Sequence, residues 1–257
     1  MTRIAVLADI HGVLPALEAV LAEPEVRSAD RIILAGDLAA GPQPVETLDL
    51  LVSLGDRAVW LRGHADRELV ALANGAELEN QRPIMAWAAT QLRPEQIELL
   101  AGLPLTVTLD VPGLGTTVFC HATPRSDEEV LLVDSPLNLW QDVLAELDRD
   151  VSTLVCGHTH MPYTRLAHRR LVINPGSVGM PYGEAGAYWA LLGDGVGVAL
   201  RRTPYDLAEA SARIGAESGY PGAGEWADYF LRARASDADA LRMFSRRNGA
   251  AASLSRG

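Results

Sequence analysis

Short apolar runs that alternate with segments of helical period constrain the fold of this chain more than any other feature. The runs are Arg3–Ala8, Arg31–Ala35, Ala58–Leu61, Thr116–Cys120, Thr153–Cys156 and Arg170–Ile173. Between the first three runs, residues 14–21 and 45–52 place their apolar side chains on one helical face. Strand and helix in alternation indicate a parallel sheet with crossover helices. The chain is therefore predicted to be an α/β protein.

The middle of the chain is predicted to be helical before shorter strands return. Residues 66–100 have helical period, and Pro83 and Pro94 are each expected to open a new helix at its first turn. This segment is a candidate lid. Further on, Tyr188–Leu192 and Val196–Leu200 flank a glycine-rich turn and are predicted to form a hairpin.

The C-terminal part of the chain is predicted to be helical from Asp206 onward. Residues 246–257, rich in Ser, Arg, Gly and Ala, are expected to form a flexible tail. Neither an internal repeat nor a long linker divides the sequence. We therefore expect residues 1–257 to form a single domain.

The charge balance excludes one class of partner. The chain has 22 Lys and Arg against 33 Asp and Glu, for a net charge of −11. Proteins that bind duplex nucleic acid need a basic surface for the phosphates, so neither duplex binding nor a nuclease is favoured. A small phosphorylated substrate remains possible, because bound metal ions can supply positive charge locally.

Cysteine content and hydropathy give the expected compartment. The two cysteines, Cys120 and Cys156, lie in apolar runs and are expected to be buried free thiols. The N-terminal residues are too polar for a signal peptide, and no window has the about 18 apolar residues of a membrane span. We expect no membrane segment and a cytoplasmic location.

Histidines and aspartates stand directly after the apolar runs. They are Asp9, His11, Asp37, His64, His121, His158 and His160, from five separate runs. Ligands of open α/β sheets bind beyond the carboxyl ends of the strands, so these side chains are expected to converge. Any one of them alone is better explained as a turn, capping or packing residue. Because five of the six histidines share this placement, a common metal site is favoured.

The residue types indicate the chemistry of that site. Imidazole and carboxylate ligands suit Mn, Fe, Zn, Ni or Co, and the shortage of cysteine argues against a thiolate zinc site. Two ions roughly 3.5–4 Å apart require a bridging carboxylate and activate a water for in-line attack on phosphorus. Gly36, Gly63 and Gly157 each precede a candidate ligand, where a sharp turn or a close backbone approach is expected.

In order along the chain, these residues resemble the calcineurin-like metallophosphoesterase superfamily, in its bacterial single-domain branch. The matching motifs are Asp9-Ile10-His11, Gly36-Asp37, Gly63-His64-Ala65-Asp66, His121 and Gly157-His158-Thr159-His160, with 122–127 and 174–179 also similar. The resemblance covers roughly residues 1–200. It implies a four-layer α/β/β/α sandwich of two mixed sheets flanked by helices.

The resemblance also implies ligands and an activity. Asp9, His11, Asp37 and His160 would hold the first metal ion, Asp37 would bridge, and His64, His121 and His158 would hold the second. The implied enzyme is a dinuclear-metal phosphoesterase in which a metal-bridging hydroxide attacks a small substrate, for example a nucleotide. Manganese is the favoured ion, and a phosphodiester is favoured over a phosphomonoester.

Two positions depart from the family pattern. His64 replaces an Asn ligand, and Ala65 stands where many relatives carry a catalytic His. His64 is therefore either a metal ligand or a general acid, and the loss of a general acid typically costs 10²–10⁴ in rate. Arg125 is a candidate phosphate ligand, with a surface ion pair to Asp127 or Glu128 as the alternative. Asp37, His64 and Arg125 are the predicted catalytic residues.

One alternative function belongs to a different class. The chain could be a catalytically degraded scaffold of the same fold, because Ala65 removes one expected catalytic group. Metal-dependent turnover would distinguish the two functions. The oligomeric state is not encoded in any pattern of the sequence.

Overall fold

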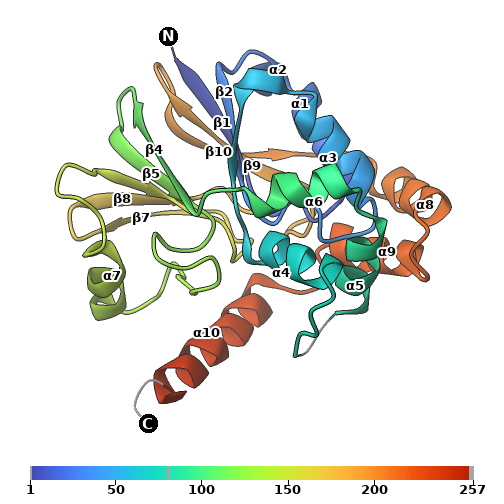
Figure 1. The fold of residues 1–257 in the computed structure, drawn as a ribbon. Helices are drawn as coiled ribbons and strands as arrows, with labels where there is room; N and C mark the ends of the chain where they lie inside the picture. The colour runs from blue at the N-terminus through green and yellow to red at the C-terminus, as the bar shows by residue number, and fades with distance from the viewer. Residues whose placement is uncertain (1, 80–81, 255–257) are drawn as a thin grey trace.

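Two five-stranded sheets stack face to face in the computed structural model, which describes residues 2–79 and 82–254, with side chains as far as residue 245 (Figure 1). The first sheet has the strand order β10-β9-β1-β2-β3. Its strands are β1 (Arg3–Leu7), β2 (Arg31–Ala35), β3 (Ala58–Leu61), β9 (Ala187–Gly193) and β10 (Gly197–Thr203). Strands β1, β2 and β3 are parallel, whereas β9 and β10 are antiparallel to their neighbours.

The second sheet has the strand order β4-β5-β6-β8-β7. Its strands are β4 (Thr106–Val111), β5 (Gly115–Cys120), β6 (Thr153–Val155), β7 (Tyr163–Ala167) and β8 (Arg170–Asn174). The three central strands are parallel, and each edge strand is antiparallel to its neighbour. Both sheets are thus mixed, with parallel strands at their centres.

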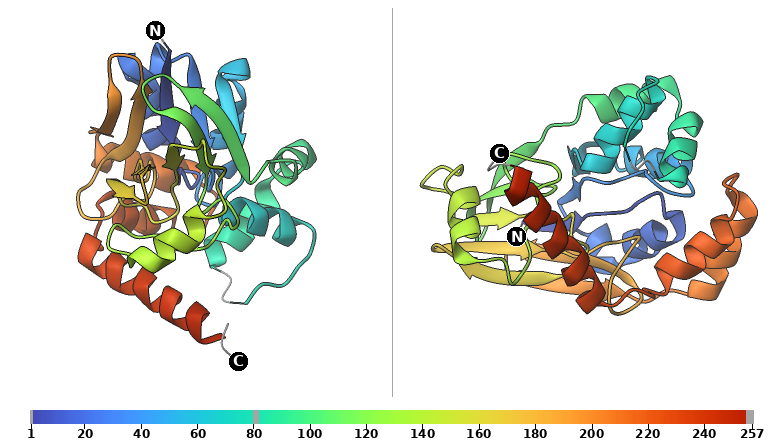
Figure 2. Two further views of the ribbon diagram at one scale, coloured as in Figure 1. Left: turned by 90° about the vertical axis from the view of Figure 1, so that its left-hand side faces the viewer. Right: turned by 90° about the horizontal axis from the view of Figure 1, so that it is seen from below.

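Helices cover the outer faces of the two sheets. Those on the first sheet are α1 (Leu14–Ala22), α2 (Pro24–Arg27), α3 (Pro44–Val52), α4 (His64–Ala73), α5 (Pro83–Gln91), α6 (Pro94–Ala101), α8 (Leu207–Glu217) and α9 (Ala223–Leu231), with the 3-10 turn η1 (Gly55–Arg57) before β3. Helix α7 (Leu137–Leu144) packs on the second sheet. These layers confirm the predicted α/β/β/α sandwich. Helix α10 (Asp237–Leu254) crosses below the ends of the sheets (Figure 2).

The central strands β1, β2 and β9 of the first sheet are buried on both faces, which explains their unbroken apolar runs. In β1, Ile4 and Val6 face the second sheet, whereas Ala5 and Leu7 face the helices. From the second sheet, Phe119 meets the first group in the core between the sheets. The outer core over the first sheet is the largest of the hydrophobic clusters and holds α1 to α6 in place.

The sequence predicted all six strands that pair in parallel, and it missed two edge strands and the helices α2 and α7. Strands β2 and β3 have the predicted bounds, and Pro83 and Pro94 open α5 and α6 as expected. Strands β4 and β7 were not predicted, because half-exposed edge strands have weak apolar runs. Both cysteines are buried free thiols, as expected.

Two predicted segments look different in the structure. Helices α4 to α6, the candidate lid, contribute buried side chains such as Ile84 and Met85 to the outer core. They form part of the helical layer, and a lid movement stays a prediction, as does the single-domain organisation. The backbone of the predicted tail is helical up to Leu254, in keeping with its alanine content, and residues 255–257 lie outside the described residues. The described part of the chain has no helix long and apolar enough to cross a membrane.

Replacing Phe119 with Ala should lower the free energy of unfolding by about 3–5 kcal/mol, because the ring is fully buried between the two sheets. Leu166→Ala is the control, since Leu166 is 74% exposed on an edge strand and should change stability by less than about 0.5 kcal/mol. Urea unfolding measures both. Equal stability of the two variants would contradict the assigned core.

Candidate metal centre

The seven predicted ligands meet at the carboxyl ends of five strands. They follow β1 (Asp9, His11), β2 (Asp37), β3 (His64), β5 (His121) and β6 (His158, His160). Their ligand atoms form two groups, and within each group the atoms lie within 4.8 Å of one another. Asp37 belongs to both groups. The parallel strands at the centres of the two sheets therefore bring all seven side chains together.

The first group contains Asp9, His11, Asp37 and His160. Nε2 of His160 lies 3.2 Å from Oδ1 of Asp9 and 3.2 Å from Nε2 of His11. Nε2 of His11 lies 3.6 Å from Oδ2 of Asp37. Four ligand atoms from both sheets thus face a common point.

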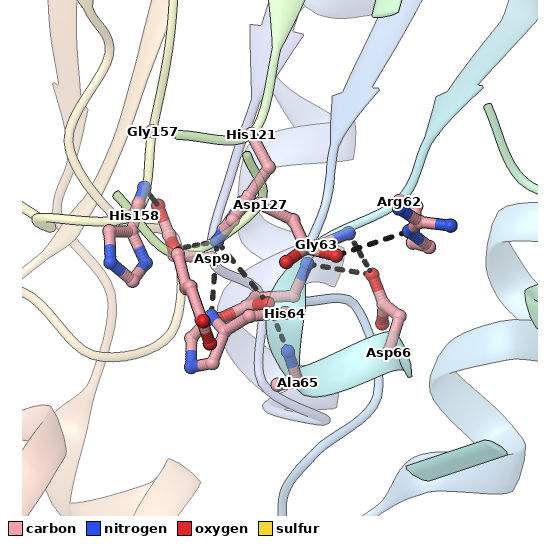
Figure 3. A network of polar contacts seen from close by, with 12 residues as sticks. Asp9, Arg62, Gly63, His64, Ala65, Asp66, His121, Asp127, Gly157 and His158 are labelled. Atoms are coloured by element: carbon pink, nitrogen blue, oxygen red, sulfur yellow. Dashed lines mark hydrogen bonds and ion pairs between the residues drawn. The ribbon is translucent and has the colours of Figure 1, made fainter. Parts of the chain in front are cut away.

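The second group contains Asp37, His64, His121 and His158. Nδ1 of His64 lies 3.0 Å from Oδ2 of Asp37, and Nε2 of His121 lies 3.3 Å from Oδ1. Figure 3 shows His64, His121 and His158 gathered near Asp9. One carboxylate is therefore shared between the two groups, and the role of Asp37 as a bridging ligand stays a prediction.

Several buried polar atoms of this cluster have no hydrogen-bond partner among the described residues. They are Oδ1 of Asp9, Oδ2 of Asp37, Nδ1 of His11 and both ring nitrogens of His158. Buried polar atoms without a partner are costly, and native proteins rarely contain several in one place. Imidazole nitrogens and carboxylate oxygens are good ligands for divalent transition ions. The residues present therefore fit two such ions.

The electrostatics of the cluster keep three of the candidate ligands in the form that binds metal. Burial lowers the pKa of His11 and of His158 well below the usual value, which favours neutral imidazole. For Asp37, burial opposes ionisation, but His121 and His64 hold its pKa well below the usual value. His121 is different. Burial lowers its pKa, but Asp37, Asp9 and the carbonyl of Ala35 raise it to about 10, so a cation must displace its proton.

The backbone at the ligands is left-handed. Among the described residues, eight non-glycine residues have positive φ, and five of them are candidate ligands: Asp9, His11, Asp37, His158 and His160, at 51–68°. This conformation costs roughly 1–3 kcal/mol per residue and gathers at functional sites. Neighbouring loops hold it in place: Asp9 N donates to Gly36 O (3.1 Å), and His11 N to Asp37 O (2.9 Å).

Glycine is required beside the shared carboxylate. A Cβ atom on Gly63 would lie 2.2 Å from both the backbone nitrogen and Oδ1 of Asp37. A Cβ on Gly157 would lie 2.8 Å from Oδ2 of Asp9, which accepts a hydrogen bond from the backbone of His158 (3.1 Å). The close approach predicted for these glycines is confirmed.

Asp66 holds the Asp37 loop, a role that the sequence analysis missed. Its carboxylate accepts hydrogen bonds from the backbone nitrogens of Asp37 (2.8 Å), Leu38 (2.8 Å) and Gly63 (2.9 Å; Figure 3). Burial and the charge of Asp37 raise its pKa to about 7. The available signal was an acidic residue three positions after the glycine that precedes α4, as in a capping box.

Arg125 does not lie among the ligands. Its guanidinium is paired with Glu129 (2.7 Å), Asp142 (2.7 Å) and Glu146 (3.6 Å). A surface ion pair therefore describes it better than a phosphate contact, but the partners are not the predicted Asp127 or Glu128. Instead Arg62 lies beside the site, paired with Asp127 (3.1 Å; Figure 3). Spacing after His121 could not show which acidic side chains the loop would bring to Arg125.

Asn174 and Ser177 shape the rim through turn contacts. The side-chain amide of Asn174 donates to the carbonyl of Gly157 (2.8 Å) and accepts from Gly176 N (2.9 Å). The hydroxyl of Ser177 donates to the carbonyl of Asp9 (2.7 Å). Both residues hold loops that carry ligands.

Replacing Asp66 with Ala should destabilise the protein by at least about 3 kcal/mol and weaken metal binding. Three buried N–H groups would lose their partner, at about 1–3 kcal/mol each. Glu98→Ala, at an exposed position of α6, is the control and should leave stability within about 0.5 kcal/mol. Urea unfolding and metal titration measure the effects. If Asp66→Ala keeps the stability and the metal affinity of the wild type, Asp66 does not hold the Asp37 loop.

Comparisons with known proteins agree with this fold and this arrangement. The model of the calcineurin-like phosphoesterase superfamily domain matches residues 2–193. A metallophosphoesterase from Sphaerobacter thermophilus superimposes with a TM-score of 0.72 at 25% identity, over 90% of this chain and 99% of that one. An uncharacterised protein of Methanocaldococcus jannaschii is 27% identical over 202 residues, 70% of this chain and 77% of its own.

A more specific similarity covers a shorter segment. The symmetrical bis(5'-nucleosyl)-tetraphosphatase of Aliivibrio fischeri is 35% identical over 118 residues, which is 45% of this chain and 43% of that enzyme. The match therefore spans less than half of the tetraphosphatase. The family model, in contrast, spans most of the chain. This chain belongs to the calcineurin-like phosphoesterase superfamily.

Proposed function

We propose that this protein is a two-metal phosphoesterase that hydrolyses a phosphodiester bond in a small nucleotide. The observation that carries the proposal is the position of Asp37 in both ligand groups. A carboxylate shared in this way is what a pair of divalent ions about 3.5–4 Å apart requires. Membership of the phosphoesterase superfamily supports the reaction class.

Each ligand group has a role in the proposal. Asp9, His11 and His160 hold one ion and His64, His121 and His158 the other, with Asp37 between them. Manganese is the proposed ion, because a set of imidazoles and carboxylates without thiolates accepts it well. When bound, the two ions activate a water and stabilise negative charge on the phosphoryl oxygens.

The chain itself fixes the geometry around the reacting phosphate. The backbone nitrogen of Ala65 donates to Oδ1 of Asp37 (2.8 Å), and Asp66 fixes the backbone of the same loop. Nδ1 of His121 donates to the carbonyl of Ala35 (2.8 Å), which directs Nε2 toward Asp37. Fixed ligands need little reorganisation during the reaction, which favours catalysis.

His64 is proposed as a ligand rather than a general acid. Its Nδ1 lies 3.0 Å from the shared carboxylate and 3.4 Å from Nε2 of His121, inside the second ligand group. Ala65, where many relatives carry a catalytic His, is fully buried in the outer core and offers no proton. Without a dedicated acid, esters with good leaving groups should react best.

The proposed substrate class rests on relatives and on charge. The tetraphosphatase of Aliivibrio fischeri, by its name, acts on a nucleotide. Positive charge at the rim comes from Arg62 and Arg67, both paired with Asp127. With a net charge of −11, the chain favours a small nucleotide over a nucleic acid.

Activity should depend strictly on metal and on Asp37. Chelator-stripped protein is assayed with bis(4-nitrophenyl) phosphate, 4-nitrophenyl phosphate and diadenosine tetraphosphate, with Mn²⁺ and other divalent ions added back. We expect turnover only with metal, faster for the diester than for the monoester. Asp37→Asn should reduce it by at least about 10³-fold, because a bridging charge is lost. Asp56→Asn, an exposed carboxylate on η1, should be neutral.

The outcomes separate the enzyme from a scaffold. Full activity of Asp37→Asn with both metals bound would refute the bridging role. Two tightly bound metals without turnover of any substrate would indicate the scaffold instead.

His64→Asn distinguishes a ligand from an acid. As a ligand, His64 can be replaced by the amide that the family uses, so metal affinity should fall while rates change by a similar factor for good and poor leaving groups. As a general acid, its loss would slow the poor leaving groups by an additional 10²–10⁴-fold. A series of aryl phosphodiesters of graded leaving-group pKa, at saturating Mn²⁺, measures the difference. If the logarithm of the rate falls more steeply with leaving-group pKa in His64→Asn than in the wild type, the ligand role is contradicted.

A further inference from the structure

The ligand histidines differ in what holds their rings. Nδ1 of His121 donates to the carbonyl of Ala35 (2.8 Å), and Nδ1 of His160 donates to the carbonyl of Met180 (2.7 Å). In each case the bond fixes the tautomer and directs Nε2 toward the carboxylates. His158 has no such anchor, because neither of its ring nitrogens has a hydrogen-bond partner among the described residues.

Ring packing is what orients His158. Its ring centroid lies 4.8 Å from that of His64, 5.2 Å from that of His121 and 5.9 Å from that of Phe244. The first two rings are themselves ligands in the proposed second group. Phe244, in contrast, is not a candidate ligand. The planes of its ring and of the His158 ring meet at 63°, close to edge-on. Such edge-on aromatic pairs are favourable beyond the effect of their buried area.

Phe244 comes from helix α10, which lies outside the residues matched by the family model. The helix docks through a separate small hydrophobic cluster. Its members are Val130, Leu132, Ala240 and Phe244, with Met161, Tyr182 and Leu241 packed against them. Phe244 is only 4% exposed. Figure 2, in the view from below, shows α10 lying across the ends of the sheets. The candidate ligands follow the carboxyl ends of the central strands.

A second aromatic contact ties the same cluster to the first ligand group. The ring of Tyr182 lies 5.7 Å from that of His160 and 6.4 Å from that of Phe244, perpendicular to the latter. Tyr182 follows Met180, whose carbonyl anchors His160. His160 therefore keeps its hydrogen bond if α10 leaves, whereas His158 loses a packing partner. The two ligand groups should respond differently to the helix.

We propose that α10 is a strap that positions His158 through Phe244, so that docking of the helix and binding of the second metal ion stabilise each other. The proposal rests on the two-metal site proposed above. Because the linkage is reciprocal, an ion held by His158 must favour the docked helix by the same factor by which docking favours the ion. Phe244 is a positioning residue, since it acts through His158.

The test is a metal titration of the full-length protein and its variants. Mn²⁺ is titrated calorimetrically into stripped wild type, Phe244→Ala, Phe244→Leu and Met243→Ala. Loss of an aromatic pair of this kind costs roughly 2–13-fold in an equilibrium constant. We expect Phe244→Ala to weaken binding of the second ion by about 2–13-fold and to leave binding of the first ion unchanged. The affinity of Phe244→Leu for the second ion should lie between those of the wild type and Phe244→Ala. Met243 is the matched control, because it is the preceding residue and 40% exposed.

A second measurement reports the reciprocal effect without using activity. Hydrogen exchange of α10 residues 237–245 is followed with and without Mn²⁺. We expect Mn²⁺ to slow exchange there in the wild type and to have no such effect in His158→Ala. Because that effect is read in the wild type, the test stands even if Phe244→Ala fails to fold.

These measurements distinguish failure of the strap proposal from failure of the two-metal site. Wild type that binds two ions, with identical affinities in Phe244→Ala and exchange unaffected by Mn²⁺, would overturn the strap and leave the two-metal site intact. Wild type that binds fewer than two ions would overturn both. A lower melting temperature of Phe244→Ala with unchanged metal affinities would indicate a purely structural helix.

Discussion

The structure depends on left-handed backbone at the carboxyl ends of its central strands. Asp9, His11 and Asp37 in the first sheet, and His158 and His160 in the second, all have positive φ. These residues follow their strands, and their ligand atoms lie within 4.8 Å of the others in the same group. The two-sheet stack is needed because neither sheet alone supplies a complete ligand group.

The energetic cost of this arrangement is offset by the loops around it. The β1 and β2 loops bond to each other, Asp9 bonds to the backbone of His158 across the sheets, and Asp66 satisfies three nitrogens of the Asp37 and Gly63 loops. Several ligand atoms of the cluster remain buried and without a hydrogen-bond partner among the described residues. Such a site is preorganised for cations, since the polypeptide has already met the cost of orienting the ligands.

The sequence predicted the parallel strands and the candidate ligands at their carboxyl ends. It did not predict contacts between side chains from separate parts of the chain. The ligands and the parallel strands follow from apolar runs with a polar residue at the end of each, and the family pattern adds the second sheet. The pairing of Arg125 with Asp142 and the contact of Phe244 with His158 join residues that are not neighbours in the chain, whereas the Arg125–Glu129 pair has a local i,i+4 spacing that the sequence analysis did not use. For the first two contacts, the reason is the same. No local spacing encodes them. Asp66 is intermediate, because its capping position was visible but its bonds to Asp37 and Leu38 were not.

The central claim is that one carboxylate, that of Asp37, lies between two metal ions. The most direct test is a crystal structure of the protein with Mn²⁺, with anomalous scattering recorded at the manganese edge. The account predicts two anomalous peaks about 3.5–4 Å apart. Asp37 should contribute an oxygen to each, with the Asp9 group on one side and the His64 group on the other. A single peak, or two peaks that do not share Asp37, would contradict it.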